Sequence, residues 1–375
     1  MHYRELGKTG VKVSVLGMGG MRYPERCENG HWTINEDLAL PLIKKSYELG
    51  VNYYDSAPYY NNSNSHKILA KGLKGFRENI NLATKLPLGD LSCTEDYRKL
   101  LEKYLTELDT AYIDFYHFWS LDKSSFENKV LKFDLIKEAL KAKDDGLIRH
   151  IAFSVHDSPE NVKYILDAAP ELETMLIQYN LLDRSNEDVI AYAVSKGVGV
   201  VAMGPVGGGR LAAPAGLYKK LTGRDSDATY ELALRFVMGN TNISCALAGF
   251  SEMEMLEKDA QIANSGAYMT EQEWAQAGRA MEEVKKFSDL YCTGCRYCSG
   301  CPQNIDIARV FDIYTKYNVY NLNSLAKDEY TGYLKDENAG KIEACIECGL
   351  CEGKCPQKLK IIENLKKADE ILKRL

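Results

Sequence analysis

The sequence predicts an α/β fold, a (β/α)8 TIM barrel followed by a small, mainly α-helical domain. Three observations predict it. Short apolar segments alternate with amphipathic ones, the alternation persists over roughly 250 residues, and a cysteine-rich region follows it. The chain has 375 residues, enough for two domains. We place the barrel at residues 1–265, a connecting helix at 266–290 and the cysteine-rich domain at 291–375.

The eight predicted strands are short, rich in β-branched or aromatic residues, and bounded by turn residues. They cover residues 13–19, 52–56, 80–85, 112–119, 148–156, 174–179, 199–203 and 245–249. A hairpin is predicted before them, over residues 3–13. Eight such strands are the TIM-barrel count. A doubly wound open sheet is the alternative, but no G-x-G-x-x-G motif follows the first strand.

Amphipathic helices are predicted between the strands because apolar residues recur there at helical spacing. They cover residues 37–49, 96–108, 133–143, 159–168, 186–196, 227–238 and 252–263. Gly50, Gly146 and Gly197 stand where helices should end, since glycine readily adopts the left-handed conformation found there. Further helices are predicted at 270–290, 307–317 and 361–375, with a polar segment near 330–341.

Two cysteine runs dominate the C-terminal region. The second, Cys345-Ile-Glu-Cys348-Gly-Leu-Cys351-Glu-Gly-Lys-Cys355-Pro356, has the bacterial iron–sulfur spacing C-x2-C-x2-C-x3-C-P. The first is Cys292-Thr-Gly-Cys295-Arg-Tyr-Cys298-Ser-Gly-Cys301-Pro302, with two residues instead of three before its last cysteine. Together the runs hold eight of the 11 cysteines. We expect them to bind two [4Fe–4S] clusters.

Zinc and disulfides are the alternative uses of these cysteines. Four-cysteine zinc sites commonly pair C-x2-C units across longer spacers, whereas three close cysteines and a Cys-Pro fit a cubane cluster better. Disulfides suit secreted proteins, and Met-His-Tyr-Arg-Glu at the start leads into a polar segment without the apolar core of a secretory signal. We therefore expect a cytoplasmic protein.

The overall composition excludes two classes of partner. The net charge of −6 and the pI near 5.7 do not indicate a nucleic-acid-binding surface. No window approaches 18 consecutive apolar residues, so no membrane span is predicted.

Polar residues mark the ends of neighbouring predicted strands, where TIM barrels carry their reactive groups. Asp55 and Lys85 end the second and third strands, Tyr60 follows Asp55 by five residues, and His117 lies in the fourth strand. A lysine ammonium makes a neighbouring phenol more acidic than its usual pKa of about 10, and a carboxylate holds that lysine in place. The set indicates a proton donor for carbonyl reduction. Taken singly, each residue also fits a helix cap, a solvated lysine or a packing aromatic.

Several longer segments carry a family resemblance. They are Tyr3-Arg-Glu-Leu-Gly-Lys-Thr-Gly10, Gly50-Val-Asn-Tyr-Tyr-Asp-Ser-Ala-Pro-Tyr-Tyr60, Leu82-Ala-Thr-Lys-Leu86, Tyr112-Ile-Asp-Phe-Tyr116 and Gly146-Leu-Ile-Arg-His-Ile-Ala-Phe-Ser154. On these segments, residues 1–265 resemble the aldo/keto reductase family. The whole chain resembles its subgroup with a C-terminal ferredoxin-like iron–sulfur region.

The resemblance implies an Asp–Tyr–Lys–His catalytic tetrad. Asp55, Tyr60 and Lys85 match by local motif. The family's histidine lies five residues after the position of Asp114, and Trp119 occupies that place here. His117 lies two residues earlier, on the same face of the strand. We assign it to the catalytic set, with core packing as the alternative.

The resemblance also implies a nicotinamide cofactor, NAD(P)H. Ser154 and Gln178 match the positions that bind its carboxamide. Val155 and Met203 replace the family's usual asparagine and the aromatic residue that stacks on nicotinamide.

Gly249 and Ser251 lie in the segment that matches the family's phosphate-binding segment, and the glycines of residues 207–210 could let backbone approach a pyrophosphate. Glu252 and Asp259 stand where the family often has Lys/Arg and Asn. Acidic groups disfavour a 2′-phosphate, so the sequence favours NADH over NADPH.

In two-cluster ferredoxins the fourth cysteine of each run binds the other cluster. By that rule one cluster takes Cys292, Cys295, Cys298 and Cys355, and the other takes Cys345, Cys348, Cys351 and Cys301.

Together these features predict an iron–sulfur oxidoreductase that reduces a carbonyl-type small molecule with NAD(P)H, with Tyr60 as the general acid. Clusters carry single electrons and hydride carries two, so a flavin, a radical step or a ferredoxin- or flavodoxin-like partner must connect them. The alternative is an electron-transfer or redox-sensing protein whose barrel has lost ordinary reductase activity, as Trp119, Val155 and Met203 suggest. A third reading makes the clusters structural.

Overall fold

The computed structural model describes residues 1–28, 31–181, 183–207, 211, 229–266, 268–270, 272–274, 292, 296–318 and 323–375. The chain divides into two compact units. The first, which we call the barrel unit, comprises Met1–Pro205 and Leu234–Tyr268. The second, the cysteine unit, comprises Val206–Ala233 and Met269–Leu375. Most of the predicted helix at 270–290 lies outside the described residues.

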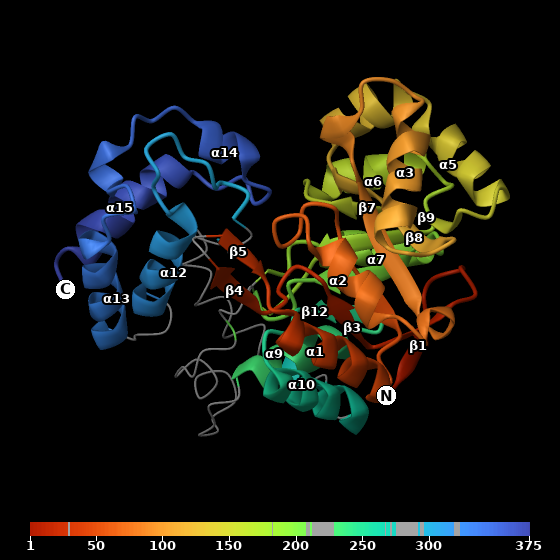
Figure 1. Ribbon diagram of the computed structural model, residues 1–375, viewed down its shortest axis with the longest axis horizontal. Helices are drawn as coiled ribbons and strands as arrows, with labels where there is room; N and C mark the ends of the chain where they lie inside the picture. The colour runs from red at the N-terminus through yellow and green to blue at the C-terminus, as the bar shows by residue number, and fades with distance from the viewer. Residues whose placement is uncertain are drawn as a thin grey trace. The chain divides into compact units, whose positions relative to one another are not determined.

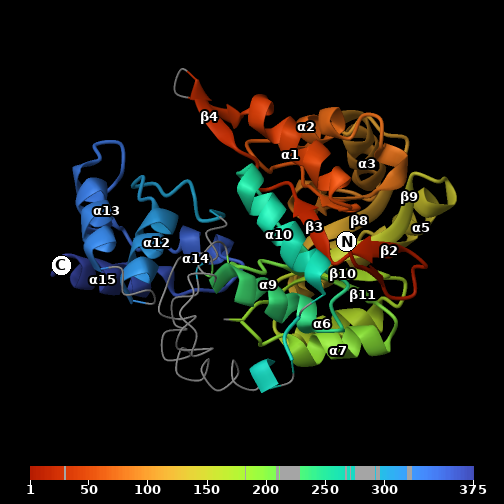
Figure 2. The ribbon, with the colours of Figure 1, turned by 90° about the horizontal axis from the view of Figure 1, so that it is seen from below.

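The barrel unit contains a closed barrel of eight parallel strands (Figure 1). In order around the barrel they are β10 (Thr174–Gln178), β11 (Gly199–Met203), β12 (Cys245–Ala248), β3 (Leu16–Gly19), β6 (Tyr53–Asp55), β7 (Asn81–Pro87), β8 (Ile113–Leu121) and β9 (Ile148–Val155). Helices surround these strands, as the turned view in Figure 2 shows. The predicted TIM barrel is confirmed.

The helices between and after the barrel strands are α1 (Glu36–Glu48), α2 (Ser65–Gly72), α3 (Asp96–Glu107), α4 (Lys123–Ser125), α5 (Leu135–Asp144), α6 (Pro159–Ala168), α7 (Glu187–Ser195), α9 (Thr229–Gly239) and α10 (Met253–Ser265). All of them except α2 and α4 begin and end close to the predicted positions. Gly50, Gly146 and Gly197 follow α1, α5 and α7 with φ of 93°, 74° and 85°, the left-handed conformation expected after a helix.

An antiparallel hairpin of β1 (Tyr3–Glu5) and β2 (Lys12–Ser14) precedes the barrel, as predicted. The predicted strand at 13–19 is in fact split, because Val13 pairs with β1 whereas Leu16 begins the barrel strand β3. Leu6 and Val13, from the hairpin region, are fully buried and pack against the apolar residues inside the barrel.

Besides the short helix α4, two elements of the barrel unit were not predicted. The first is the antiparallel hairpin of β4 (Glu25–Glu28) and β5 (His31–Ile34), whose strands are short and rich in polar residues. The second is α2, which follows Tyr60 and buries His66, Ile68 and Leu69 on one face. Within the described residues no helix is long and apolar enough to cross a membrane.

The cysteine unit is built on helices that share one apolar core. They are α12 (Ile307–Asn318), α13 (Asn323–Lys335), α14 (Leu350–Lys354) and α15 (Ile361–Leu372). The core contains Phe311, Tyr333, Leu365 and the buried Cys355. The predicted polar segment near 330–341 is helical up to Lys335, because the two tyrosines there turn inward and supply the apolar face of α13.

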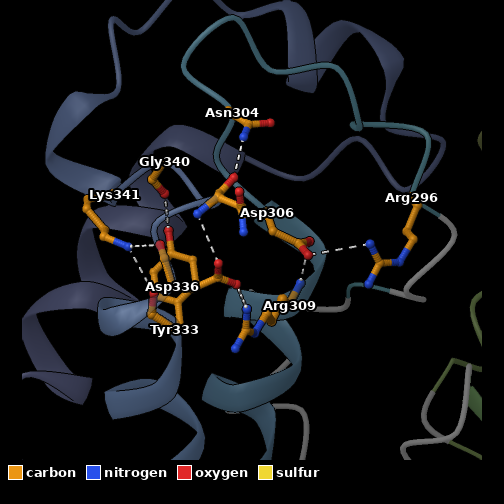
Figure 3. A network of polar contacts seen from close by, with 9 residues as sticks. Arg296, Asn304, Asp306, Arg309, Tyr333, Asp336, Gly340 and Lys341 are labelled. Carbon is orange, nitrogen blue, oxygen red and sulfur yellow. Dashed lines mark hydrogen bonds and ion pairs between the residues drawn. The ribbon is translucent and has the colours of Figure 1, made fainter. Parts of the chain in front are cut away.

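A polar network joins the turn after α13 to the loop after Cys301 (Figure 3). Gly340 N–H donates to the carbonyl of Asn304 at 2.8 Å, and the Tyr333 hydroxyl donates to the carbonyl of Gly340 at 2.5 Å. Arg309 pairs with Asp336 at 2.8 Å, which fixes the start of α12 against the end of α13.

Candidate active site and cysteine centre

The predicted site residues of the barrel belong to one layer of inward-facing side chains. The layer below it, nearer the hairpin, is largely apolar and consists of Tyr53, Ala83, Phe115, Ala152, Leu176, Val201 and Cys245. Successive residues of a strand point to opposite faces. The residues two positions further on are therefore also inward, and they are Asp55, Lys85, His117, Ser154, Gln178, Met203 and Leu247. All of these except Leu247 are positions that the sequence analysis considered for catalysis or cofactor binding. The strands thus bring six such positions to one end of the barrel.

Asp55 and Lys85 form a buried ion pair at this end of the barrel. The Lys85 ammonium contacts Asp55 Oδ1 and donates to the carbonyl of Ser56 at 2.8 Å. Asp55 is 2% and Lys85 1% exposed. Burial raises the pKa of Asp55, and the charge of Lys85 opposes that rise. Among the described residues Asp55 Oδ2 has no hydrogen-bond partner.

Tyr60 lies over this pair at the mouth of the barrel. The Lys85 ammonium is 4.8 Å from the centre of the Tyr60 ring. Trp119 meets the same ring edge-on, with centroids 5.8 Å apart, and the Trp119 ring also lies 5.6 Å from the ring of Tyr59. The Tyr59 hydroxyl donates to Asp90. Trp119 thus contacts Tyr60 from β8.

His117 lies one layer deeper than Trp119. It pairs in register with Lys85 on one side and Ala152 on the other, and it is 0% exposed. Burial and the charge of Lys85 lower the pKa of His117 to about 3, while the Phe153 backbone acts in the opposite direction. Neither ring nitrogen makes a hydrogen bond of normal geometry within the described residues. His117 is therefore a neutral imidazole beside Lys85.

The two predicted carboxamide-binding residues end β9 and β10. Ser154 Oγ accepts from the Ser120 amide at 2.8 Å, which leaves its own proton to donate. Gln178 is 6% exposed, and Gly204 packs directly on its amide. A Cβ at Gly204 would lie 2.8 Å from both the oxygen and the nitrogen of that amide. Only glycine therefore leaves the Gln178 amide in its present place.

The predicted phosphate-binding segment follows β12. Arg22, in the loop after β3, packs its side chain on Gly249, with its Cβ 3.0 Å from where a Gly249 Cβ would lie. The sequence analysis missed Arg22. Ser251 and Glu252 are exposed at the start of α10, and burial raises the pKa of Asp259 within that helix to about 7. Residues 208–210 lie outside the described residues.

The structure brings five of the predicted cluster ligands around one cavity of the cysteine unit. The cysteines that line it are Cys298, Cys301, Cys345, Cys348 and Cys351. Cys301 thus lines the same cavity as the first three cysteines of the second run, and so does Cys298, which the ferredoxin rule gives to the other cluster. The predicted division of the cysteines between two clusters therefore stays a prediction. Cys292 and Cys355 pack against the helical core, and Cys295 lies outside the described residues. Among the described side chains, no three potential ligands lie close enough together to hold a single metal ion.

The ends of the two runs have matching backbone conformations. Cys301-Pro-Gln-Asn304 and Cys355-Pro-Gln-Lys358 each form a turn whose last N–H donates to the cysteine carbonyl, at 2.8 and 3.1 Å. The last residue of each turn has φ near 50°, at 52° and 50°. A helix begins six residues after each cysteine, α12 in one case and α15 in the other.

The middles of the runs match as well. Arg296 and Gly349, each just after the second cysteine of its run, have φ of 61° and 72°. Left-handed residues at these places turn the chain around a compact centre, as a cubane cluster requires. The thiol donors, the cavity and the repeated turns therefore fit the binding of iron–sulfur clusters.

Residues 15–280 match the Aldo/keto reductase family, and residues 291–360 match the 4Fe-4S dicluster domain. The chain belongs to the aldo/keto reductase family. It is an oxidoreductase of that family with a C-terminal 4Fe-4S dicluster domain.

Known proteins similar to this aldo/keto reductase match about two thirds to three quarters of its length. L-galactose dehydrogenase of Arabidopsis thaliana is 29% identical over 282 residues, which cover 68% of this chain and 86% of that protein. An oxidoreductase of Bacillus subtilis, YqkF, is 24% identical over 318 residues, covering 76% and 99%. The holo form of an aldo-keto reductase from Bacillus halodurans superposes with a TM-score of 0.63 at 24% identity, covering 75% and 96%. The last likeness shows the fold alone.

Proposed function

We propose that this aldo/keto reductase reduces a carbonyl-type small molecule with NAD(P)H, with Tyr60 as the general acid. The observation that carries the proposal is the buried Asp55–Lys85 pair whose ammonium lies 4.8 Å from the Tyr60 ring. An ion pair with a purely structural role would not require the partly exposed Tyr60 next to it at the open end of the barrel.

Bound NAD(P)H would supply the hydride that adds to the carbonyl carbon. The Tyr60 hydroxyl then gives its proton to the carbonyl oxygen, and the O–H bond of the alcohol forms as that of Tyr60 breaks. The nearby Lys85 ammonium stabilises the phenolate that remains. Asp55 keeps Lys85 charged although the site is buried. Solvent can restore the Tyr60 proton because this side chain is half-exposed.

We assign the cofactor contacts to residues at the ends of four strands. Ser154 and Gln178 would hold the carboxamide, since a hydroxyl donor and a side-chain amide suit its oxygen and nitrogen. The segment from Gly249 to Ser251 would hold the phosphates, and Arg22 beside it would supply the positive charge that Glu252 does not. An acidic Glu252 disfavours a 2′-phosphate, so we propose NADH as the preferred form.

We propose His117 as a positioning residue rather than a proton donor. It is fully buried one layer below Tyr60, and a pKa of about 3 keeps it neutral at neutral pH. Because the imidazole is neutral, it does not compete with the Lys85 ammonium for the negative charge of Asp55. Trp119 would form the pocket wall instead, holding the Tyr60 ring edge-on.

The cysteine unit would supply one-electron transfer when its two clusters are bound. Its own residues hold the clusters through the eight cysteines and set the loops around them by the left-handed turns. A ferredoxin- or flavodoxin-like protein is the exchange partner we propose for these single electrons, and a flavin is an alternative connection to hydride chemistry.

Tyr60→Phe tests the proposal, with Tyr59→Phe as the matched control. Tyr59 is the neighbouring phenol, but its hydroxyl bonds to Asp90 and it is 52% exposed. Tyr60→Phe should lower NAD(P)H-dependent reduction of a panel of small aldehydes and ketones by about 10²- to 10⁴-fold. Iron and sulfide content should not change, and Tyr59→Phe should keep most activity. Equal activity of Tyr60→Phe and the parent protein would refute the role of Tyr60.

A second candidate is an electron-transfer or redox-sensing protein without reductase activity. Trp119 at the histidine position favours it, because an indole cannot accept a hydrogen bond as an imidazole can. Titration of the anaerobic protein with NADH and NADPH separates the two candidates. Binding followed by bleaching of the cluster absorbance supports the reductase, and absence of binding supports the carrier.

A further inference from the structure

Two large apolar side chains of the cysteine unit flank an exposed cysteine. Ile346 is 60% exposed and Leu350 is 53% exposed, on either side of the exposed Cys348. Among the described residues no large apolar side chain is more exposed than Ile346. Single exposed apolar residues are ordinary, but a pair beside a predicted cluster ligand forms a patch that marks an interaction surface.

This patch belongs to one of the two predicted clusters. Ile346, Leu350 and Cys348 all line the cavity that Cys301, Cys345 and Cys351 also line. Cys355, which the ferredoxin rule gives to the other cluster, is buried in the helical core. The cavity therefore has an exposed cysteine at its edge, where a partner could approach a cluster held there.

The acidic residues beside the patch have partners within the cysteine unit, whereas two lysines do not. Glu347 pairs with Lys366 at 2.5 Å, Glu343 contacts Lys373, and Glu352 accepts from the Ile362 amide at 2.9 Å. These three carboxylates are thus neutralised or engaged by their own unit.

The lysines that follow the patch in the sequence are not paired in this way. Lys354 and Lys358 are exposed, and neither ammonium has a carboxylate partner within the described residues. Lys354 lines the cavity itself, and Lys358 lies four residues further along the chain. The patch therefore combines apolar residues with unpaired positive charge, which complements an acidic protein surface.

We propose that the surface of Ile346, Leu350, Lys354 and Lys358 docks a small acidic one-electron carrier protein. The inference deepens the proposed function, because it rests on the electron-carrying role of the cysteine unit. One electron leaves the reduced carrier and enters the cluster at the cavity, so the carrier is oxidised and the cluster reduced by one electron. No bond forms or breaks, and small, weak interfaces are typical of such exchanges.

The test uses the full-length holoprotein, purified without oxygen, and an acidic bacterial two-cluster ferredoxin as the probe. Calorimetry at low and high salt gives the dissociation constant. The apolar variant carries Ile346→Ser and Leu350→Ser, and the charge variant carries Lys354→Glu and Lys358→Glu. The controls are Leu334→Ser and Lys335→Glu on α13, where Leu334 is 38% exposed.

Both patch variants should weaken binding by about tenfold or more at unchanged iron content, whereas the controls should keep the parent affinity. The affinity of the parent protein should fall as salt rises, and the charge variant should lose that salt dependence. Equal affinity of patch variants and controls would overturn the proposal. The proposal would also be overturned if the parent protein formed an oligomer that the apolar variant did not form, since a second copy of the chain would then bind the patch.

Tyr60→Phe separates this inference from the proposed function. It should bind the ferredoxin as tightly as the parent protein while losing carbonyl reduction. If the parent protein bound the ferredoxin at the patch but had no reductase activity, the docking proposal would be supported and the catalytic proposal refuted.

Discussion

At the scale of single residues, burial decides what His117 can do. The ring is 0% exposed, and its pKa falls from the ordinary 6.5 to about 3. The unfolded chain therefore binds a proton below pH 6.5 that the folded chain does not, so stability is lost as the pH falls from 6.5 toward 3. Above pH 6.5 both states are neutral and the contribution is constant.

His117→Gln tests this linkage. Between pH 7.5 and pH 5 the parent barrel should lose about 2 kcal/mol more unfolding free energy than the variant, at up to about 1.4 kcal/mol per pH unit. Urea titrations followed by tryptophan fluorescence measure it. His66, whose pKa burial also lowers, is present in both proteins and cancels in the comparison. Parallel pH profiles of the two proteins would show that His117 carries no such linkage.

Residue types and local motifs were enough to single out Asp55 and Lys85, because both end buried strands and the barrel topology joins neighbouring ends. The sequence could not tell that Trp119 contacts Tyr60 while His117 is fully buried beside Lys85. Both residues share a strand face, and what surrounds each of them depends on residues from other strands and loops. Arg22 was missed because its neighbour Gly249 is more than 200 residues away, a contact that local patterns do not encode.

At the scale of elements, regular alternation was the reliable signal. The buried strand β11 and the helix α6 have the predicted bounds, because each combines a continuous apolar pattern with a clear terminus. The hairpin of β4 and β5 and the helix α13 were not predicted, since the hairpin strands are short and both elements are rich in polar residues.

One turn holds the elements of the cysteine unit together. A Cβ at Gly340 would lie 1.7 Å from the carbonyl oxygen of Gln303, in the turn that begins at Cys301. Gly340→Ala must therefore displace that turn and its cysteine. We expect iron content well below that of the parent protein and an earlier thermal transition of the cysteine unit.

Gly332→Ala is the matched control. Gly332 lies within α13, and the nearest atom to its Cβ would be Arg309 Nη2 at 4.0 Å. Alanine has the higher helix propensity, so this variant should keep its iron and gain up to about 1 kcal/mol. Iron analysis and differential scanning calorimetry compare the two substitutions. Full iron content in Gly340→Ala would mean that the turn does not position Cys301.

At the scale of the whole molecule, two kinds of core stabilise the two units. The barrel unit closes eight strands around stacked layers of side chains and needs no metal to do so. The cysteine unit has a smaller apolar core in which Cys355 is itself a buried member. Small cores seldom suffice without a metal or another cross-link, so cluster binding should contribute to folding of this unit.

Anaerobic removal of iron with a chelator should therefore affect the units differently. Amide exchange measured by mass spectrometry should show loss of protection in α12, α13 and α15, because these helices surround the cysteine loops and share the core with Cys355. Strands β6 to β9 should keep theirs, since their hydrogen bonds close the barrel independently of any cysteine ligand. Reconstitution with iron and sulfide should restore the lost protection. Unchanged exchange in the three helices would show that the clusters do not stabilise this unit, and simultaneous loss in the barrel strands would show that the two units unfold as one.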